Sequence, residues 1–394
     1  MPSATPIALS RRTFVASAAL APLGAAAAGQ QPPPPVTPRA TGRPAPEREM
    51  GDPLPDAERL GWAVVGLGDF AANQMIPAFE DSRMARITGF VSGNPAKLAD
   101  YGQRHGVTSL YTYDQFDRIA NDPAIDVVYI VLPNSLHAEY AIRALDAGRH
   151  VFCEKPMALT AADCERMIAA AKRRGKQLGV AYRAHFEPHN LEAERLLKSG
   201  AIGTLRHFTS EHGRILDPSK PADQWRADKR LAGGGSLYDI GVYALNAACW
   251  FMGADPVAVD ARISNPAGDP RFATVEDVVS WRMRFPDDRI ATCMSGYSFE
   301  NVKRYQFFGS TGTLKLDGAT DYYDNSVMLE NERGRQDLSV GQASEQFAGE
   351  IDGFCEAVRA NRPHKTPAEM GLRDVRIMQA IYRSAADDGR TVRL

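Results

Sequence analysis

The chain has 394 residues, of which 44% are hydrophobic and 24% are charged, and its formal net charge is -2. This length favours two compact domains, and the composition is that of an ordinary soluble protein that can bury large cores. Because acidic and basic residues are interleaved and nearly balanced, the charge gives no reason to expect a nucleic acid or an acidic membrane surface as a partner.

The N-terminus carries the pair Arg11-Arg12, followed by an alanine-rich apolar stretch that reaches Ala28. Paired arginines before a weakly hydrophobic segment with small residues at its end predict a twin-arginine export signal over residues 1–28. The segment is too short and too weakly apolar for a membrane span. Since this route carries folded proteins, a dinucleotide can be taken up before export, and we expect a periplasmic protein.

Residues 29–60 are rich in Pro, Gly, Arg and acids and include four consecutive prolines. Such a segment cannot bury enough apolar area to fold alone, and its prolines favour an extended backbone. Two interpretations stay open, a plain linker and an arm that docks on a neighbouring subunit.

From residue 61 onward, strand and helix patterns alternate, which predicts a doubly wound parallel sheet, a Rossmann domain, over residues 61–181. The predicted strands are residues 63–66, 87–92, 126–131 and 150–153, and the predicted helices are residues 71–80, a segment from Pro95, and residues 135–147. Residues 126–131 form a continuous apolar run, as expected of a parallel strand covered on both faces.

The pattern changes in residues 182–394. Alternating stretches at 277–285, 290–297 and 305–309 predict a large, open, mostly antiparallel sheet, and helices are expected near 343–360 and 368–387. We therefore expect an α+β domain for catalysis and oligomerisation, with C-terminal helices able to pack back on the Rossmann domain.

The cysteines and histidines do not form a metal-ligand pattern. The five cysteines lack a C-x-x-C pair and mostly lie in apolar runs, so we interpret them as buried small hydrophobic residues. In His185-Phe186-Glu187-Pro188-His189 the glutamate is misplaced for a zinc helix and the proline disfavours a helix. No metal site is expected.

The first chemical motif is Gly66-Leu67-Gly68-Asp69-Phe70-Ala71, between the first predicted strand and helix. Gly66 permits the tight turn, Gly68 lets the backbone approach a pyrophosphate, and Ala71 is small enough for helix–strand packing. The strand–turn–helix context makes this motif a predicted dinucleotide site. The second strand ends in Ser92 without an acid, and Lys97 follows, which favours NADP over NAD.

The second motif is Cys153-Glu154-Lys155-Pro156, at the carboxyl end of a strand, where ligands of such sheets bind. A lysine there can lower the pKa of a neighbouring hydroxyl and stabilise a developing oxyanion. A solvated loop lysine is the equal alternative.

The third motif is the run from Gly233 to Tyr243. Ser236 is a plausible helix N-cap, and Asp239 and Tyr243 are then four residues apart on one helix face. A tyrosine beside a lysine and a carboxylate can transfer a proton to or from a sugar hydroxyl, although an incidental helical pair would look the same. Trp225 offers an apolar face for a sugar ring or for packing.

In this order, the motifs resemble the glucose–fructose oxidoreductase branch of the Gfo/Idh/MocA oxidoreductase family. Family-wide marks are the glycine-rich turn, residues 132–137 and Glu154-Lys155-Pro156, and the marks of the branch include residues 91–94, 224–226, 233–243 and the arm segment 44–50. The resemblance implies that Lys155, Asp239 and Tyr243 are catalytic. It also implies a homodimer or homotetramer with exchanged arms.

The resemblance further implies tightly bound NADP and a sugar pocket. The expected cofactor-binding residues are Gly66, Gly68, Phe70, Ala71, Ser92, Lys97, Leu132, Asn134, His137, Glu154, Lys155, Arg183, Trp225 and Arg226. The expected substrate-binding residues are Lys155, Tyr182, Arg183, Trp225, Asp239 and Tyr243.

The reaction expected from the resemblance has two half-reactions. Tyr243, with Lys155 and Asp239, takes the proton of an aldose hydroxyl while C1 is oxidised to a lactone, and a second sugar, fructose or another aldose, is then reduced to a polyol. Three alternatives stay open. They are an aldose dehydrogenase with exchangeable NADP, an NAD-dependent glycosidase, disfavoured by the lack of an acid near Ser92, and a non-catalytic sugar-binding protein.

Overall fold

The computed structural model describes residues 52–340 and 345–394. The predicted export signal and residues 29–51 of the predicted arm lie outside this part. Within it, the last residues before the first strand contact the first domain. The Leu54 N–H donates to the carbonyl of Arg83 (3.0 Å), and the Arg83 guanidinium donates to the carbonyl of Asp52 (3.2 Å).

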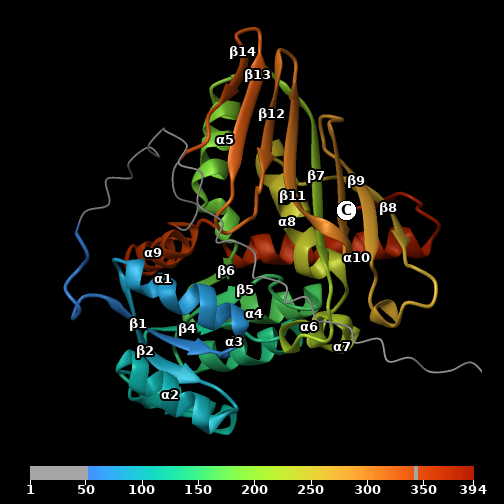
Figure 1. Cartoon of the computed structure of the whole chain (residues 1–394). Helices are drawn as coiled ribbons and strands as arrows, with labels where there is room; N and C mark the ends of the chain where they lie inside the picture. Colours follow the sequence, from blue (N-terminus) through green and yellow to red (C-terminus); the bar gives the residue numbers. More distant parts are fainter. Residues whose placement is uncertain (1–51, 341–344) are drawn as a thin grey trace, which may run out of the picture. The chain divides into compact units, whose positions relative to one another are not determined.

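The first domain is built on six parallel strands in the order β3-β2-β1-β4-β5-β6 (Figure 1). The strands are β1 Leu60–Val65, β2 Ala85–Val91, β3 Ser109–Tyr111, β4 Val127–Ile130, β5 His150–Glu154 and β6 Leu178–Ala181. From β1 the chain adds β2 and β3 on one side of the sheet, and it then returns to add β4, β5 and β6 on the other side. Ligands of such sheets bind outside the carboxyl ends of the strands at this switch point between β1 and β4.

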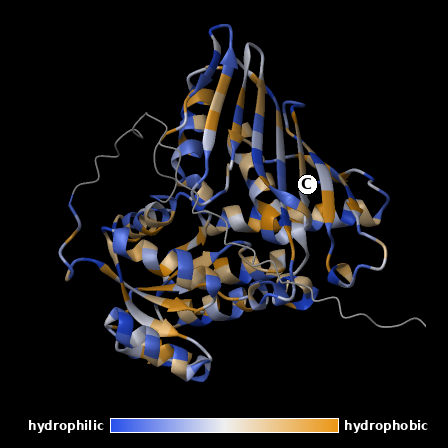
Figure 2. Cartoon of the chain, in the orientation of Figure 1, coloured by the Kyte–Doolittle hydropathy of each residue, from blue (hydrophilic) through white to orange (hydrophobic). Residues whose placement is uncertain are grey.

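Helices cover both faces of this sheet. They are α1 Ile76–Asp81, α2 Pro95–His105, α3 His137–Asp146 and α4 Ala161–Arg174, with a π-helical turn η1 Ala71–Met75 and 3-10 turns at Tyr113–Asn121 and Asn134–Leu136. Side chains of β1 alternate between two cores, Trp62 and Val64 with α1 and α2, and Ala63 and Val65 with α3 and α4. The resulting apolar strands are visible in Figure 2.

The second domain is built on nine strands in the order β14-β13-β12-β11-β7-β10-β9-β8-β15. Only the pair β7 and β10 is parallel among the described pairs of this sheet. The strands are β7 Leu205–Ile215, β8 Ala258–Ser264, β9 Val278–Arg284, β10 Ile290–Gly296, β11 Ser298–Gly309, β12 Gly312–Asp317, β13 Ser326–Asn331, β14 Gly334–Asp337 and β15 Val392–Arg393.

The helices α5 Pro188–Lys198, α8 Val242–Met252 and α10 Ala368–Ala386 pack against strands of the nine-stranded sheet. Short helical segments precede α8, namely η4 Arg183–His185, α6 Pro221–Gln224, η5 Trp225–Ala227, α7 Lys229–Ala232 and the π-helical turn η6 Leu237–Gly241, and η7 Pro270–Phe272 lies before β9. These segments, together with β5 and the helix α9 Glu345–Arg359, position the candidate site.

The C-terminal helices also contact the first domain. In α9 Glu345–Arg359, the Asp352 carboxylate accepts bonds from the Ser82 hydroxyl (2.6 Å) and the Met84 N–H (3.1 Å). In α10, Arg376 pairs with Glu165 of α4 at 2.7 Å. Phe347, Ile351 and Phe354 of α9 join the same core as Trp62, so both domains share apolar packing.

The predicted fold class, a Rossmann domain followed by an α+β domain with a mostly antiparallel sheet, is confirmed. The five cysteines are buried and free, in agreement with their interpretation. As expected, no α-helix spans residues 185–189; α5 begins at Pro188, where a proline at the first helical position loses no hydrogen bond. In the described part of the chain, no helix is long and apolar enough to cross a membrane.

Candidate active site

The glycine-rich turn follows β1 directly. Gly66 has φ of +98°, and a Cβ at this position would lie 2.4 Å from the carbonyl oxygen of Val131, so the turn requires glycine. A Cβ at Gly68 would meet nothing within 4 Å, and the backbone there is open to a ligand. Phe70 and Ala71 then begin η1. This arrangement fits the pyrophosphate of a dinucleotide, which needs close backbone approach at a helix N-terminus.

The tip of β2 is neutral or basic. Ser92 is buried, and its hydroxyl accepts a bond from the Asn94 N–H at 3.3 Å. Asn94 caps α2 by accepting from the Lys97 N–H (3.1 Å), and the Lys97 ammonium donates to the Leu67 carbonyl in the glycine-rich turn. A positive charge beside the turn, with no carboxylate at the tip, fits a ribose phosphate better than a free ribose hydroxyl.

Lys155 follows the end of β5 and links the two domains. Its ammonium donates to the Asp239 carbonyl oxygen at 2.7 Å and lies 3.9 Å from Asp239 Oδ1. The neighbouring Glu154 accepts bonds from the Tyr129 hydroxyl and from the Lys155 N–H (3.3 Å). Burial lowers the pKa of Lys155 below its ordinary value, although the charges of Asp239 and Glu154 offset part of this effect.

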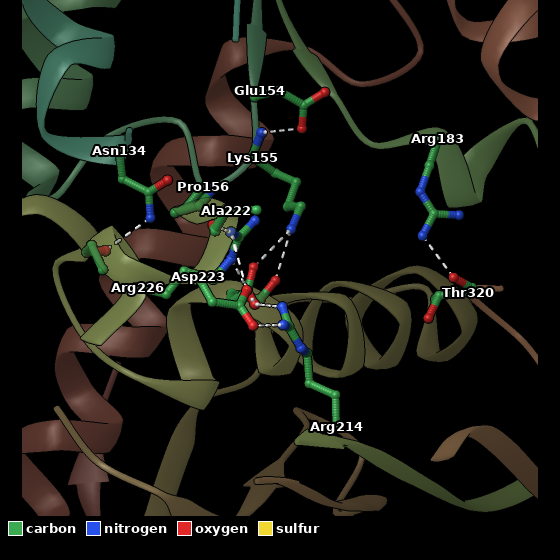
Figure 3. Close-up of polar contacts among 12 residues, drawn as sticks. Asn134, Glu154, Lys155, Pro156, Arg183, Arg214, Ala222, Asp223, Arg226 and Thr320 are labelled. Atoms are coloured by element: carbon green, nitrogen blue, oxygen red, sulfur yellow. Dashed lines mark hydrogen bonds and ion pairs between the residues drawn. The ribbon is translucent and has the colours of Figure 1, made fainter. Parts of the chain in front are cut away.

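Asp239 is surrounded by the cations of Lys155, Arg214 and Arg226. The side chains of these three residues converge in Figure 3. The Oδ2 of Asp239 accepts from the Tyr297 hydroxyl (2.9 Å) and from Arg214 (3.3 Å), and it lies 3.2 Å from Nε of Arg226. Burial opposes ionisation, but the charges of Arg226, Lys155 and Arg214 outweigh it and hold the pKa of Asp239 below its usual range. Asp239 is therefore a fixed negative charge that keeps the Lys155 ammonium in place.

Tyr243 lies one turn further, in α8, and is 8% exposed. The Lys155 ammonium is 4.7 Å and the Arg183 guanidinium carbon 5.1 Å from the centroid of its ring. Burial raises the pKa of Tyr243 above its ordinary value, and the positive charge of Arg183 opposes the rise. A phenol between two cations can hold its proton at neutral pH and still reach the phenolate form during a reaction.

Arg183 lies in η4, after the end of β6, and is almost fully buried. Its guanidinium donates to the Thr320 carbonyl at 2.6 Å and to the Gln346 side chain of α9, and it stacks on Tyr322 with 4.6 Å between its carbon and the ring centroid. Loops and helices far apart in sequence thus hold this cation against Tyr243.

Trp225 and Arg226 also reach the site. The Arg226 guanidinium stacks on the Trp225 ring at 4.5 Å, pairs with Asp239, and lies 3.5 Å from Asp223. Leu132 and Asn134 are at the end of β4, where the Asn134 amide donates to the Ala232 carbonyl (2.8 Å). The structure thus brings most of the predicted residues to the carboxyl ends of β1, β4 and β5.

Two predictions of local structure are wrong. Ser236 does not cap a helix, because its hydroxyl donates to the Asp277 carbonyl. Glu276 instead accepts from the Gly235 and Leu237 N–H groups, at 2.7 Å and 3.0 Å. The Asp239–Tyr243 segment is not one regular α-helix, because η6 is wound as a π-helical turn before α8 begins.

Tyr182 and His137 do not line the site through their side chains. The Tyr182 hydroxyl donates to Asp374 (2.6 Å) in a buried network, because consecutive residues after β6 point to opposite sides. His137 is fully buried, with its ring nitrogens 2.9 Å from the Pro156 carbonyl and 2.8 Å from that of Leu132. It ties two loops of the site together, and burial lowers its pKa.

Sequence reasoning missed Arg214, Tyr297, Tyr322, Gln346 and Glu350. Arg214 and Tyr297 approach Asp239 from the nine-stranded sheet, and Tyr322 and Gln346 hold Arg183. None of them stands in a motif. The only local signal is a polar residue inside an apolar pattern, as with Gln346 and Glu350 in the buried face of α9.

Comparisons with known proteins agree with both domains. Residues 60–182 match the family model described as "Oxidoreductase family, NAD-binding Rossmann fold", and residues 190–315 match the "GFO/IDH/MocA C-terminal domain". The D-xylose 1-dehydrogenase [NADP(+)] of Haloarcula marismortui is 30% identical over 340 residues, which are 84% of this chain and 92% of that protein.

Two solved structures are similar over most of their length. The aldose-aldose oxidoreductase from Caulobacter crescentus, complexed with glycerol, is 41% identical with a TM-score of 0.82, covering 85% of this chain and 100% of that one. A 3-ketoreductase from Actinomadura kijaniata, in complex with NADP and TDP-benzene, is 27% identical with a TM-score of 0.74, covering 83% of this chain and 98% of that one.

Proposed function

Because the chain belongs to the GFO/IDH/MocA oxidoreductase family, we propose that it is an NADP-dependent sugar oxidoreductase that couples two sugars. One aldose is oxidised at C1 to a lactone, and a second sugar, another aldose or fructose, is reduced to a polyol. The proposal depends on the position of the Lys155 ammonium. This group, at the end of a strand of the domain that carries the glycine-rich turn, contacts both Asp239 and Tyr243 of the second domain. Similarity to an aldose-aldose oxidoreductase at 41% identity supports this choice of reaction.

The residues suit proton transfer in both directions. A dinucleotide held at the glycine-rich turn would supply hydride-transfer chemistry to both sugars. Tyr243 takes the proton of the donor hydroxyl and gives one to the acceptor carbonyl oxygen. Lys155, held charged by Asp239, stabilises negative charge on the reacting oxygen, and such electrostatic stabilisation is commonly worth about 10²–10³-fold in rate.

NADP is supported by the basic tip of β2, where Lys97 and Ser92 would hold the ribose phosphate. We expect Lys97→Ala to weaken NADP binding about tenfold, as loss of one charge-assisted bond does, and to leave NAD binding nearly unchanged. Calorimetric titration of each nucleotide provides the measurement, with NAD as the internal control. If the binding of NADP and of NAD were weakened equally, Lys97 would not be the residue that contacts the ribose phosphate of NADP.

A retained cofactor fits the predicted export. A periplasmic enzyme that was exported in its folded form would meet little free nucleotide. A second sugar would therefore have to reoxidise the cofactor that the first sugar reduced. We also propose that copies of the chain associate and exchange the part of the predicted arm that precedes residue 52, since Asp52 and Leu54 contact Arg83 of their own chain. The oligomeric state would be measured by light scattering with and without these residues.

The test uses purified protein with no added nucleotide, followed by near-ultraviolet absorbance. Glucose alone is expected to produce a stoichiometric band of reduced nicotinamide, and fructose or a second aldose is expected to erase it while a polyol appears. If a band forms only after NADP is supplied, the protein is an aldose 1-dehydrogenase with exchangeable cofactor. That alternative is favoured by the similarity to a D-xylose 1-dehydrogenase. If no band forms with any aldose even then, the proposed function is wrong.

A further inference from the structure

His212, in β7, is a buried histidine that the proposed reaction does not use. Its ring is stacked on that of Tyr243, with 6.2 Å between the ring centroids and 16° between the planes, within the range where such rings attract. Tyr305 of β11 packs against His212 at 5.7 Å, and its hydroxyl donates to the backbone carbonyl of Tyr243 at 3.4 Å. Two neighbouring strands of the nine-stranded sheet thus contact the candidate catalytic tyrosine.

Both ring nitrogens of His212 are paired with buried hydroxyl groups. Nε2 lies 2.9 Å from Oγ1 of Thr320, and Nδ1 lies 3.2 Å from Oγ of Ser210. Burial, followed by the positive charges of Lys303 and Arg183, lowers the pKa of His212 to about 3. A neutral imidazole whose two nitrogens both bind hydroxyl groups is suited to fixing its neighbours in place.

Thr320, between β12 and β13, connects His212 to the cation beside Tyr243. The Thr320 carbonyl accepts a bond from the Arg183 guanidinium at 2.6 Å (Figure 3). The carbon of this guanidinium lies 5.1 Å from the centroid of the Tyr243 ring. The contacts therefore form a closed circuit of four residues, Tyr243, His212, Thr320 and Arg183. In this circuit the phenol and the cation are each held from the side of His212.

We propose that His212 is a positioning residue that keeps the phenol of Tyr243 at its working distance from the Arg183 guanidinium, an inference that rests on the proposed sugar oxidoreduction. The Arg183 charge opposes the rise in the pKa of Tyr243, so it favours the phenolate form that takes the proton of the sugar hydroxyl. This help falls with distance, and a misplacement of about 1 Å in a catalytic group can cost about a hundredfold in rate.

The experiment measures hydride transfer in a single oxidation half-reaction. Enzyme loaded with NADP is mixed rapidly with increasing glucose, and near-ultraviolet absorbance gives the maximal rate and the half-saturating glucose concentration. His212→Phe keeps a ring beside Tyr243 but cannot bind the Thr320 hydroxyl. We expect the maximal rate to fall about tenfold or more, while the half-saturating concentration changes by less than about twofold.

The outcomes separate the two proposals. An unchanged maximal rate in His212→Phe would overturn the positioning role and leave the proposed function intact. A wild-type enzyme that forms no reduced band with glucose or another aldose would contradict the proposed function itself.

Variants of Thr320 test the same contact from its other end. Thr320→Val removes the hydroxyl but keeps the carbonyl that Arg183 uses, so the rate should fall as in His212→Phe. Thr320→Ser retains a hydroxyl and should recover most of the rate. Because both changes break one contact, the double variant His212→Phe/Thr320→Val should lose no more than either single variant. Losses that multiply to about a hundredfold would contradict a shared contact.

His364→Phe is the matched control. His364 is also buried, stacks on a ring (Phe186, 5.5 Å and 12°) and lies 3.0 Å from a threonine hydroxyl (Thr366), but its aromatic partners in the described part of the chain are phenylalanines. We expect this variant to lower the melting temperature and to keep a rate near that of wild type. A loss of rate equal to that of His212→Phe would show a general packing effect and overturn the proposal. If His212→Phe does not fold, the comparison of Thr320→Val with Thr320→Ser decides alone.

Discussion

Asp239, which contacts Lys155, and Glu350, in α9, are two carboxyl groups with opposite surroundings. Asp239 has three cations and a tyrosine hydroxyl within reach, and its pKa is lowered. Glu350 has no hydrogen-bond partner among the described residues, and its pKa is raised. Glu350 is 1% exposed and the Asp239 side chain only 13% exposed, so shielding from solvent alone does not set the charge. The partners decide which carboxyl is a fixed charge and which can carry a proton.

The largest effect is expected from removing the cation that Asp239 holds. Lys155→Met leaves no charge beside the reacting oxygen, and we expect kcat to fall by about 10³-fold or more, with nucleotide affinity nearly kept. Steady-state kinetics and nucleotide titration measure both quantities. The exposed Lys172→Met is the control. Turnover within a few-fold of wild type would remove Lys155 from the mechanism.

Neutralising the fixed charge tests the other half of the same ion pair. Asp239→Asn leaves Lys155, Arg214 and Arg226 without their shared carboxylate, and we expect kcat to fall by about 10²-fold. Because the Asp239 charge raises the pKa of Lys155, its loss lowers that pKa. The alkaline limb of the kcat/KM profile should therefore move to lower pH. An unmoved limb would mean that the ammonium form of Lys155 is not required.

Replacing the guanidinium of Arg183, which lies against Tyr243, should have a smaller effect. Lysine at position 183 keeps the charge but cannot reproduce the forked contacts with Thr320 and Gln346. Arg183 lowers the pKa of Tyr243 and of Glu350, so Arg183→Lys should raise both. We expect sugar oxidation to slow about tenfold and its acid limb to move to higher pH. Arg206→Lys, on the exposed side of β7, is the control, and a profile equal to that of the control would contradict this role.

The smallest expected effect is on stability. Because folding raises the pKa of Glu350, its contribution is complete below the ordinary glutamate pKa of about 4.3 and is lost as the pH rises toward the folded pKa. Glutamine does not titrate, so the melting temperature of Glu350→Gln should rise by about 2–4 °C relative to that of wild type as the pH increases above about 4.3. The exposed Glu300→Gln should follow wild type. A difference independent of pH would mean that Glu350 does not titrate in this range.

The sequence predicts the parts of the site that depend on local backbone geometry. Gly66 and Gly68 stand between a strand and a helix, and Lys155 ends a strand, so their place in the sheet follows from the fold class alone. Asp239 and Tyr243 are neighbours in one segment, and the structure brings both to Lys155. Their catalytic roles stay predictions.

The residues that surround Arg183, on one side of Tyr243, could not be predicted from the sequence. Arg183, Tyr322, Gln346 and Glu350 come from separate segments that meet only when α9 packs against the first domain. The sequence also does not predict which way a side chain points after a strand ends. Both Tyr182 and Arg183 were expected in the site, but only Arg183 points toward Tyr243. The start of η6 is bound by Glu276, which accepts from the Gly235 and Leu237 N–H groups and lies about 40 residues later in the chain, so no local pattern announces this contact.

The most direct test of the two-sugar proposal follows the hydride itself. Glucose carrying deuterium at C1 is incubated with the enzyme, an acceptor sugar and an excess of free unlabelled NADPH, and the polyol is analysed by mass spectrometry. We expect each polyol molecule to carry one deuterium, because the hydride passes between sugars on a cofactor that does not exchange. An unlabelled polyol would contradict a retained cofactor, and the absence of any polyol would contradict the coupling of two sugars.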